Sequence, residues 1–263
     1  MMRDRPFAVV TGASTGIGYE LARRLALHEH ELLVTADDAE LTAAAERLRK
    51  LTTAVVAVRA DLTRADEVRT LLERIADQDR PVDVLVINAG TAVGGEIAEA
   101  DLAAQLAVVD LNVRAAVHLS RVLVPGMVRR ARGRILFTSS IAALAPGPYQ
   151  ATYNASKAFL LSFSQALRAE LARTGVTVTT LLPGPTDTPF FRRTGMTRTR
   201  LAQAPKDDPA TVARQACQAL AAGRPQVVTG SRLNRLAAAV AKVVPEPVKA
   251  ALHRPLTVPR PRS

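Results

Sequence analysis

The sequence predicts an α/β fold, a single doubly wound parallel sheet flanked by helices. Short apolar runs alternate with segments of helical periodicity along most of the chain. A glycine-rich turn separates the first apolar run from the first helical segment. Polar or small residues follow several of the apolar runs, where the carboxyl ends of parallel strands share one edge of a sheet: Gly12, Asp37, Asp61, Asn88 and Ser140.

Composition agrees with one globular domain. The chain has 263 residues, of which 48% are hydrophobic, so it can bury a full core. We expect one domain over residues 1–230 and an extension over 231–263. Cys217 is the single cysteine, which argues against an internal disulfide and a thiolate metal site. Because no apolar signal core precedes the first strand and no apolar stretch approaches a membrane span, we expect a soluble, cytoplasmic protein.

The formal net charge of +11 raises the question of nucleic-acid binding. The excess is local. After Gly223 the chain contains eight arginines and lysines but one acidic residue, Glu246. A further basic group consists of Arg192, Arg193, Arg198 and Arg200. Aromatic residues make up 3% and tryptophan is absent, which leaves few platforms for base stacking. We therefore expect no nucleic-acid partner.

The first apolar run, Phe7 to Val10, leads into Thr11-Gly12-Ala13-Ser14-Thr15-Gly16-Ile17-Gly18. Glycines at this spacing allow a tight turn, close approach of a pyrophosphate, and packing of the next helix on the strand. That helix, predicted from Tyr19 to His28, would offer its N-terminal amides to phosphates. The turn predicts dinucleotide binding, and an ordinary glycine-rich strand–helix turn is the alternative.

The second strand, Glu31 to Thr35, is followed by two aspartates. A carboxylate at this distance from the glycines accepts hydrogen bonds from ribose hydroxyls and repels a 2′-phosphate, which favours NAD over NADP. Aspartate is also a good N-cap for the helix through Leu41 and Leu48. We assign Asp37 to the ribose and Asp38 to the cap.

The alternation continues to about residue 182. We predict further strands at 54–58, 82–87, 134–138 and 176–182, and helices at 64–76, 101–124 and from Tyr153 to about 173. Asn112 interrupts the apolar pattern of the second of these helices, and a buried asparagine bonded to a local carbonyl is its alternative explanation. Pro183 and Gly184 begin a rigid loop at the ligand-binding edge of the sheet.

The segment around Tyr153 carries the chemistry. On a helix, Tyr153 and Lys157 lie on one face, and a nearby ammonium lowers the pKa of a phenol. Ser139 and Ser140 follow the fifth strand, where a hydroxyl enters a cleft. The pair can therefore transfer protons. A surface helix with lysine methylenes over an aromatic ring is the alternative.

Together these motifs resemble the short-chain dehydrogenase/reductase family over nearly the whole chain up to Gly230. The glycine turn, Asn88-Ala89-Gly90, the Ser140 to Tyr153 spacing, the Tyr-x-x-x-Lys pair and the Pro-Gly loop occur in the family's order. The resemblance implies a Rossmann-like fold, a homo-oligomer, and an NAD(P)-dependent oxidoreductase that acts on CH–OH groups. It also implies the catalytic residues Asn112, Ser140, Tyr153 and Lys157.

The resemblance gives each residue a role. Tyr153 exchanges a proton with the substrate oxygen, Ser140 hydrogen-bonds that oxygen, Lys157 lowers the Tyr153 pKa and holds the nicotinamide ribose, and Asn112 anchors a water. Asp37 follows Ala36, one residue beyond the place where NAD-preferring members carry their acid, so NADP stays the alternative cofactor. The implied cofactor residues are Gly12, Ser14, Thr15, Gly16, Ile17, Gly18, Asp37, Asp61, Leu62, Asn88, Ala89, Gly90, Tyr153, Lys157, Pro183, Gly184 and Thr188.

Two basic segments complete the chain. Residues from about 189 to 208 should form a lid whose arginines either bind an acidic substrate or are solvated. Arg232 to Val244 predicts an amphipathic helix that either lies on an anionic membrane or packs on protein. Pro245 and Pro247 should interrupt it before Val248 to Leu252, and Pro255 to Ser263 should be disordered.

The leading functional hypothesis is an NAD-preferring alcohol dehydrogenase or ketoreductase. The alternatives are a non-catalytic nucleotide-binding regulator and a membrane-surface protein on the same fold. Ala142, Ala143, Leu144, Pro146 and Pro148 suggest an apolar substrate pocket. No motif indicates a metal.

Overall fold

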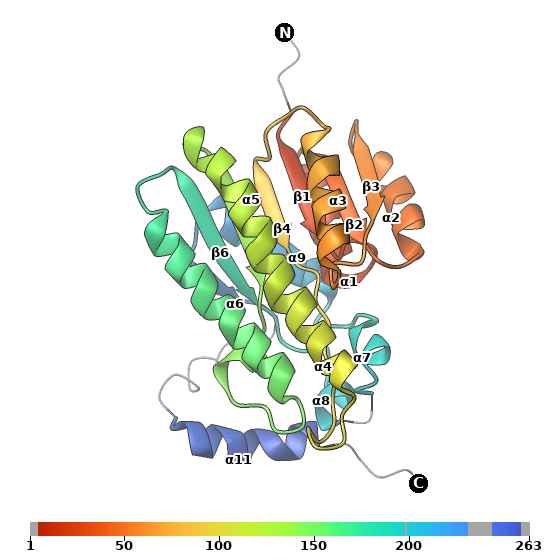
Figure 1. The fold of residues 1–263 in the computed structure, drawn as a ribbon, viewed down its shortest axis with the longest axis vertical. Helices are drawn as coiled ribbons and strands as arrows, with labels where there is room; N and C mark the ends of the chain where they lie inside the picture. Colours follow the sequence, from red (N-terminus) through yellow and green to blue (C-terminus); the bar gives the residue numbers. More distant parts are fainter. Residues whose placement is uncertain (1–4, 198, 231–243, 259–263) are drawn as a thin grey trace.

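The computed structural model describes residues 5–197, 199–230 and 244–258 (Figure 1). Seven parallel strands form one sheet in the order β3-β2-β1-β4-β5-β6-β7. The strands are β1 Phe7–Thr11, β2 Glu31–Ala36, β3 Val55–Arg59, β4 Val84–Ile87, β5 Gly133–Thr138, β6 Val176–Leu182 and β7 Gln226–Val228. The predicted doubly wound parallel sheet is confirmed, with β7 as a strand that the sequence did not predict.

Helices cover both faces of the sheet (Figure 1). One face packs against α1 Gly16–Leu27, α2 Glu40–Arg49 and α9 Pro209–Ala221. The other packs against α3 Ala65–Ala76, α5 Ala115–Arg129 and α6 Ala151–Glu170. Because both faces are covered, β1 and β4 are buried along their whole length, which explains their unbroken apolar sequences.

Several helices begin at side chains that satisfy their free amides. Asp101 accepts hydrogen bonds from the amides of residues 103 and 104 at the start of α4 Leu102–Val109. Asp208 does the same for α9, and Pro209 occupies its first position, where no amide partner is needed. Asp38 does not cap α2, because the cap position is Ala39 and carries no side-chain hydrogen bond. That part of the prediction was wrong.

The helix predicted at 101–124 is longer than expected. It runs from Leu102 to Arg129 as α4, a π-helical turn Asp110–Arg114, and α5, which continues past Pro125. The run has the length and mean hydropathy, 1.3, of a membrane span, so the expectation that no stretch approaches one was wrong. Its buried residues Ala115, Ala116, Leu119, Val124 and Met127 belong to the hydrophobic core on one face of the sheet.

The lid and the C-terminal segment lie at the carboxyl edge of the sheet. The lid holds two one-turn helices, α7 Phe190–Arg193 and α8 Arg200–Gln203. Helix α11 Glu246–Thr257 lies across this end of the molecule and packs against α8 (Figure 1). It begins with Pro247 in its first turn and includes Pro255, so disorder from residue 255 was the wrong prediction for 255–257. The helix predicted over Arg232 to Val244 lies outside the described residues, apart from its last residue.

Candidate active site

A cleft of about 540 Å³ opens where the strands of the sheet end. Its walls come from the loops after β1, β2, β3, β4, β5 and β6, together with the lid and α11. All 17 residues predicted to contact the cofactor line this cleft, and so does Ser140. Of the predicted residues, Asn112 alone lies behind the wall. The topology therefore collects residues from six separate loops around one cavity.

The glycine turn fits a phosphate-binding loop. Gly12 and Gly16 have φ values of +66° and +57°, which other residues rarely adopt. A Cβ at Gly18 would lie 2.0 Å from the Gly12 carbonyl oxygen, so the helix can approach the strand only because glycine is there. The turn leads directly into α1, whose first amides face the cleft edge.

The side chain of Asn88 fixes the backbone of this turn through hydrogen bonds. Its side-chain amide donates to the carbonyl oxygens of Thr11 and Gly12, at 3.1 and 3.2 Å. The Thr11 hydroxyl in turn accepts from the amides of Asn88 and Ala89, at 2.9 and 3.0 Å. The Asn-Ala-Gly motif therefore fixes the shape of the glycine turn, a role that the sequence alone did not assign.

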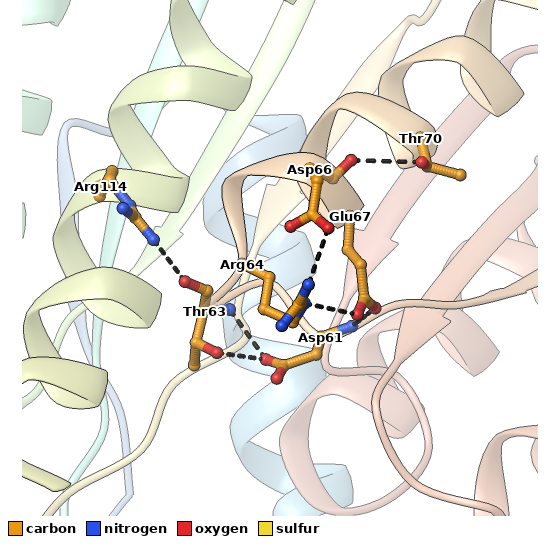
Figure 2. Close-up of polar contacts among 7 residues, drawn as sticks. All are labelled: Asp61, Thr63, Arg64, Asp66, Glu67, Thr70 and Arg114. Carbon is orange, nitrogen blue, oxygen red and sulfur yellow. Dashed lines mark hydrogen bonds and ion pairs between the residues drawn. The ribbon is translucent and has the colours of Figure 1, made fainter. Parts of the chain in front are cut away.

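Hydrogen bonds also fix the loop after β3, which forms another wall (Figure 2). The Asp61 carboxylate accepts from the amide and hydroxyl of Thr63, and Glu67 accepts from the Asp61 amide. Arg64 pairs with Asp66 and Glu67, and Arg114 from the π-helical turn donates to the Thr63 carbonyl oxygen. These contacts hold Asp61 and Leu62 at the side of the cleft where an adenine would lie.

The other end of the cleft brings Ser140, Tyr153 and Lys157 together. The Ser140 hydroxyl lies near enough to the Tyr153 phenol to act on its pKa, and it also accepts from the Ala142 amide at 3.1 Å. Lys157 Nζ lies 5.8 Å from the centroid of the Tyr153 ring and donates to the Thr138 carbonyl oxygen at 3.0 Å. Ser139 faces α6 instead, where its hydroxyl donates to the Lys157 carbonyl oxygen at 2.7 Å. The geometry agrees with the choice of Ser140 over Ser139.

Asn112 is fully engaged by protein groups. Its amide donates to the Thr91 carbonyl oxygen and the Ser156 hydroxyl, at 2.9 and 2.8 Å, and its oxygen accepts from the Thr91 amide. A Cβ at Gly90 would lie 3.1 Å from Lys157 Nζ and 3.2 Å from Asn112 Oδ1. Gly90 therefore leaves the space in which these two side chains approach each other. The π-helical turn is the local structure that buries Asn112 there.

Burial controls the protonation of the reactive pair. It raises the pKa of Tyr153 to about 12, although the hydrogen bond with Ser140 acts in the opposite direction. It lowers the pKa of Lys157 to about 8, because the buried ammonium loses its hydration. The lysine was expected to lower the Tyr153 pKa, but in this structure desolvation has the larger effect. The Tyr153 phenol is therefore protonated at neutral pH.

The cleft and its residues agree with comparisons to known proteins. The family model for short chain dehydrogenases matches residues 6–199. The chain belongs to the short-chain dehydrogenase family. This result confirms the resemblance that the motifs indicated, and it makes the protein an oxidoreductase.

Two bacterial relatives illustrate the range of this dehydrogenase family. An uncharacterized oxidoreductase of Staphylococcus saprophyticus is 36% identical over 184 residues, which cover 69% of this chain and 79% of the relative. A putative ketoacyl reductase of Streptomyces coelicolor is 35% identical over 190 residues, which cover 71% and 73%.

Solved structures of the family include complexes with either nicotinamide dinucleotide. The dehydrogenase superimposes on a short-chain dehydrogenase from Sphingobium yanoikuyae in complex with NADPH with a TM-score of 0.79 and 29% identity, covering 90% of this chain and 94% of that one. A family member from Burkholderia phymatum in complex with NAD gives a TM-score of 0.82 and 26% identity, covering 98% and 99%. These structures therefore do not favour NAD over NADPH as the cofactor of this chain.

The structure of the dehydrogenase adds cleft residues that sequence reasoning missed. Phe190 lies 5.8 Å from the Tyr153 ring, measured between centroids, and Phe191 packs with Met196 in a small apolar cluster. His253 reaches the cleft from α11, where burial lowers the pKa of its imidazole and Nδ1 has no hydrogen-bond partner among the described residues. The basic lid gave no signal of which residues face inward, and nothing in the sequence near His253 resembles a family motif.

Replacing Gly18 by alanine tests the glycine turn of the dehydrogenase. The added methyl group must displace the backbone of Gly12, which we expect to lower the free energy of unfolding by about 1–3 kcal/mol and to weaken NADH binding. Thermal unfolding and fluorescence titration with NADH measure the two effects. Gly126→Ala is the matched control, because its Cβ would meet only flexible arginine ends and helix interiors favour alanine. An unchanged NADH affinity in Gly18→Ala would contradict the assigned role of the turn.

Proposed function

We propose that the protein transfers a hydride between a nicotinamide cofactor, with NAD preferred over NADP, and a secondary alcohol or ketone. The observation that carries this proposal is the grouping of Ser140, Tyr153 and Lys157 at one end of a cleft whose other end is the glycine turn. Membership of an oxidoreductase family supports the same reaction class.

The cleft fits a dinucleotide by its own chemistry. Gly12, Gly16 and Gly18 line the cleft where the turn enters α1, which is where a pyrophosphate would approach the backbone. At the adenosine side, Asp37 and Asp38 line the cleft just after β2, where a carboxylate would accept hydrogen bonds from ribose hydroxyls. Lys157 stands at the nicotinamide side and would hold the second ribose. When bound, the nicotinamide supplies or accepts the hydride.

The protein residues then handle the oxygen and its proton. In ketone reduction the Tyr153 hydroxyl gives its proton to the substrate oxygen as the carbon receives the hydride, and in alcohol oxidation both transfers run backwards. Ser140 donates a hydrogen bond to the same oxygen, where negative charge develops. The Lys157 ammonium stabilises the phenolate left on Tyr153. Asn112 positions the loop of Gly90 beside Lys157, and we propose that it also helps to order a water there.

The walls around Tyr153 support an apolar substrate. Ala142, Phe190, Phe191 and Met196 line this end of the cleft. Selectivity for NAD is supported by Asp37 and Asp38, which line the cleft just after β2 and would repel a 2′-phosphate.

A panel of secondary alcohols and ketones with NADH and NADPH tests the proposal. Turnover is followed by the absorbance of the reduced nicotinamide. We expect oxidation or reduction of bulky apolar members, with a higher kcat/KM for the NAD couple. Absence of turnover across the panel, despite measurable NADH binding, would instead support a non-catalytic nucleotide-binding protein.

We further propose that the protein acts as a homo-oligomer. Large apolar side chains are exposed along the Leu102–Arg129 run and on α6: Leu102, Leu106, Val109, Val117, Val122 and Phe159. A second copy of the chain would remove this surface from water. Contact of the C-terminal extension with a membrane stays a prediction.

A further inference from the structure

An ion pair joins the lid to the adenosine side of the cleft. Arg193, the last residue of α7, lies 3.0 Å from Asp38 Oδ2 through Nη1. Its second terminal nitrogen, Nη2, donates to the Thr15 hydroxyl at 3.3 Å. The contact spans 155 residues of sequence, so it brings a cation to a place where the neighbouring sequence supplies none.

A second hydrogen bond, from Ser14, also fixes the position of the Asp38 carboxylate. The Ser14 hydroxyl donates to Oδ2 at 2.7 Å, so one carboxylate oxygen is shared by Ser14 and Arg193. The second oxygen, Oδ1, is buried and unpartnered among the described residues. Asp38 lines the cleft at the junction of the glycine turn and the end of β2. That junction is where the adenosine ribose of a dinucleotide lies.

The charges at this junction matter for a ribose that carries a phosphate. Asp37 and Asp38 would repel a 2′-phosphate, while a guanidinium binds one through two parallel hydrogen bonds. The Arg193 side chain is 52% exposed, so it can move from Asp38 to an incoming phosphate without leaving a buried charge behind. Its neighbour Arg192 is exposed and does not line the cleft.

We propose that Arg193 is a cofactor-specificity residue: it neutralises Asp38 and binds the 2′-phosphate when the cofactor is phosphorylated. Asp38 serves the free ribose hydroxyls, and Arg193 allows the phosphorylated cofactor to enter a site that two carboxylates would otherwise close to it. The lid thereby contributes to a choice that is usually made at the end of β2. This inference rests on the proposed function, because it assumes that a dinucleotide occupies the cleft.

Direct binding measurements test the assignment without turnover. NADH and NADPH are titrated against the full chain by nicotinamide fluorescence, and 5′-AMP and adenosine 2′,5′-bisphosphate are titrated by calorimetry. For Arg193→Ala we expect about tenfold weaker binding of both 2′-phosphorylated probes and less than about threefold change for NADH and 5′-AMP. Arg192→Ala, with the same change in net charge, should leave all four affinities within about twofold.

The reciprocal variant sharpens the result. Asp38→Asn should weaken NADH while binding of NADPH stays equal or tightens, since Arg193 is then released from its carboxylate. Arg193→Lys keeps the positive charge and should therefore bind the 2′-phosphorylated probes more tightly than Arg193→Ala does. If the alanine variant unfolds, the lysine variant still tests the role of the guanidinium. Equal weakening of all probes by Arg193→Ala, or a wild-type chain that binds NADH but no 2′-phosphorylated probe, overturns the inference. A chain that binds none of the probes contradicts the proposed function instead.

Discussion

Tyr153→Phe is expected to lower kcat by about 10²–10⁴-fold, the contribution of one positioned proton donor, while NADH binding stays within about twofold of wild type. Phenylalanine keeps the ring that packs beside Phe190 and loses only the hydroxyl. The loss should therefore appear in the chemical step and leave the fold intact. Steady-state kinetics with the best substrate of the panel, together with NADH titration, separate the two effects.

Tyr19→Phe is the control for this variant. The Tyr19 hydroxyl accepts a hydrogen bond from Arg47 on the outer face of α1, away from Tyr153. Its removal should leave kcat unchanged. Full turnover by Tyr153→Phe would remove the proposed acid–base mechanism, and an equal loss in both variants would indicate a general effect on stability.

Lys157→Met is expected to abolish turnover and to stabilise the protein without cofactor. Lys157 is buried, and its pKa falls to about 8 from 10.5 because the charged form loses its hydration. A methionine fills similar space without a charge, at the loss of the hydrogen bond to Thr138. At pH 7 we expect a gain of about 1–3 kcal/mol in the free energy of unfolding.

The sign of the pH dependence follows from linkage. Between about pH 8 and 10.5 the unfolded chain keeps the Lys157 proton and the folded chain loses it, so the wild type gains stability as pH rises through this window. Below pH 8 both states hold the proton and the full cost of the buried charge remains. The advantage of Lys157→Met should thus be largest at neutral pH and shrink toward pH 10.5.

Denaturant unfolding of both proteins across this pH range measures the effect. Lys50→Met, at an exposed position after α2, controls for the loss of a positive charge and should show no such pH-dependent gain. A Lys157→Met protein less stable than wild type at pH 7 would show that Lys157 contributes to the resting fold through contacts and not only to the reaction.

Local patterns predicted most of the sheet and the cleft. Glycine spacing and the i, i+4 relation of Tyr153 and Lys157 are short-range constraints, and the carboxyl ends of parallel strands bring such residues together. Strand β7 was missed because three residues carry too little periodicity. The cap assignment of Asp38 was wrong because its partner, Arg193, lies far away in sequence, and an aspartate before a helix more often caps it.

The C-terminal segment shows the same limit. Its prolines suggested disorder, yet α11 is a helix that places His253 in the cleft. One contact that holds it there is distant in sequence, since Arg254 donates to the Tyr149 hydroxyl at 3.5 Å. The Tyr153 pKa could not be read from sequence either, because the depth of burial decides whether desolvation or a neighbouring charge has the larger effect. Cytoplasmic location and the domain division at residue 230 stay predictions.

Helix α7 is a single turn, yet Phe190 at its start packs beside Tyr153 and Arg193 at its end reaches Asp38. A change that reshapes one end of this short rigid piece will shift the other. If the proposed roles of the two residues hold, a substitution that enlarges the pocket at Phe190 should also change the relative affinities for NADH and NADPH, so both should be measured in the same variant.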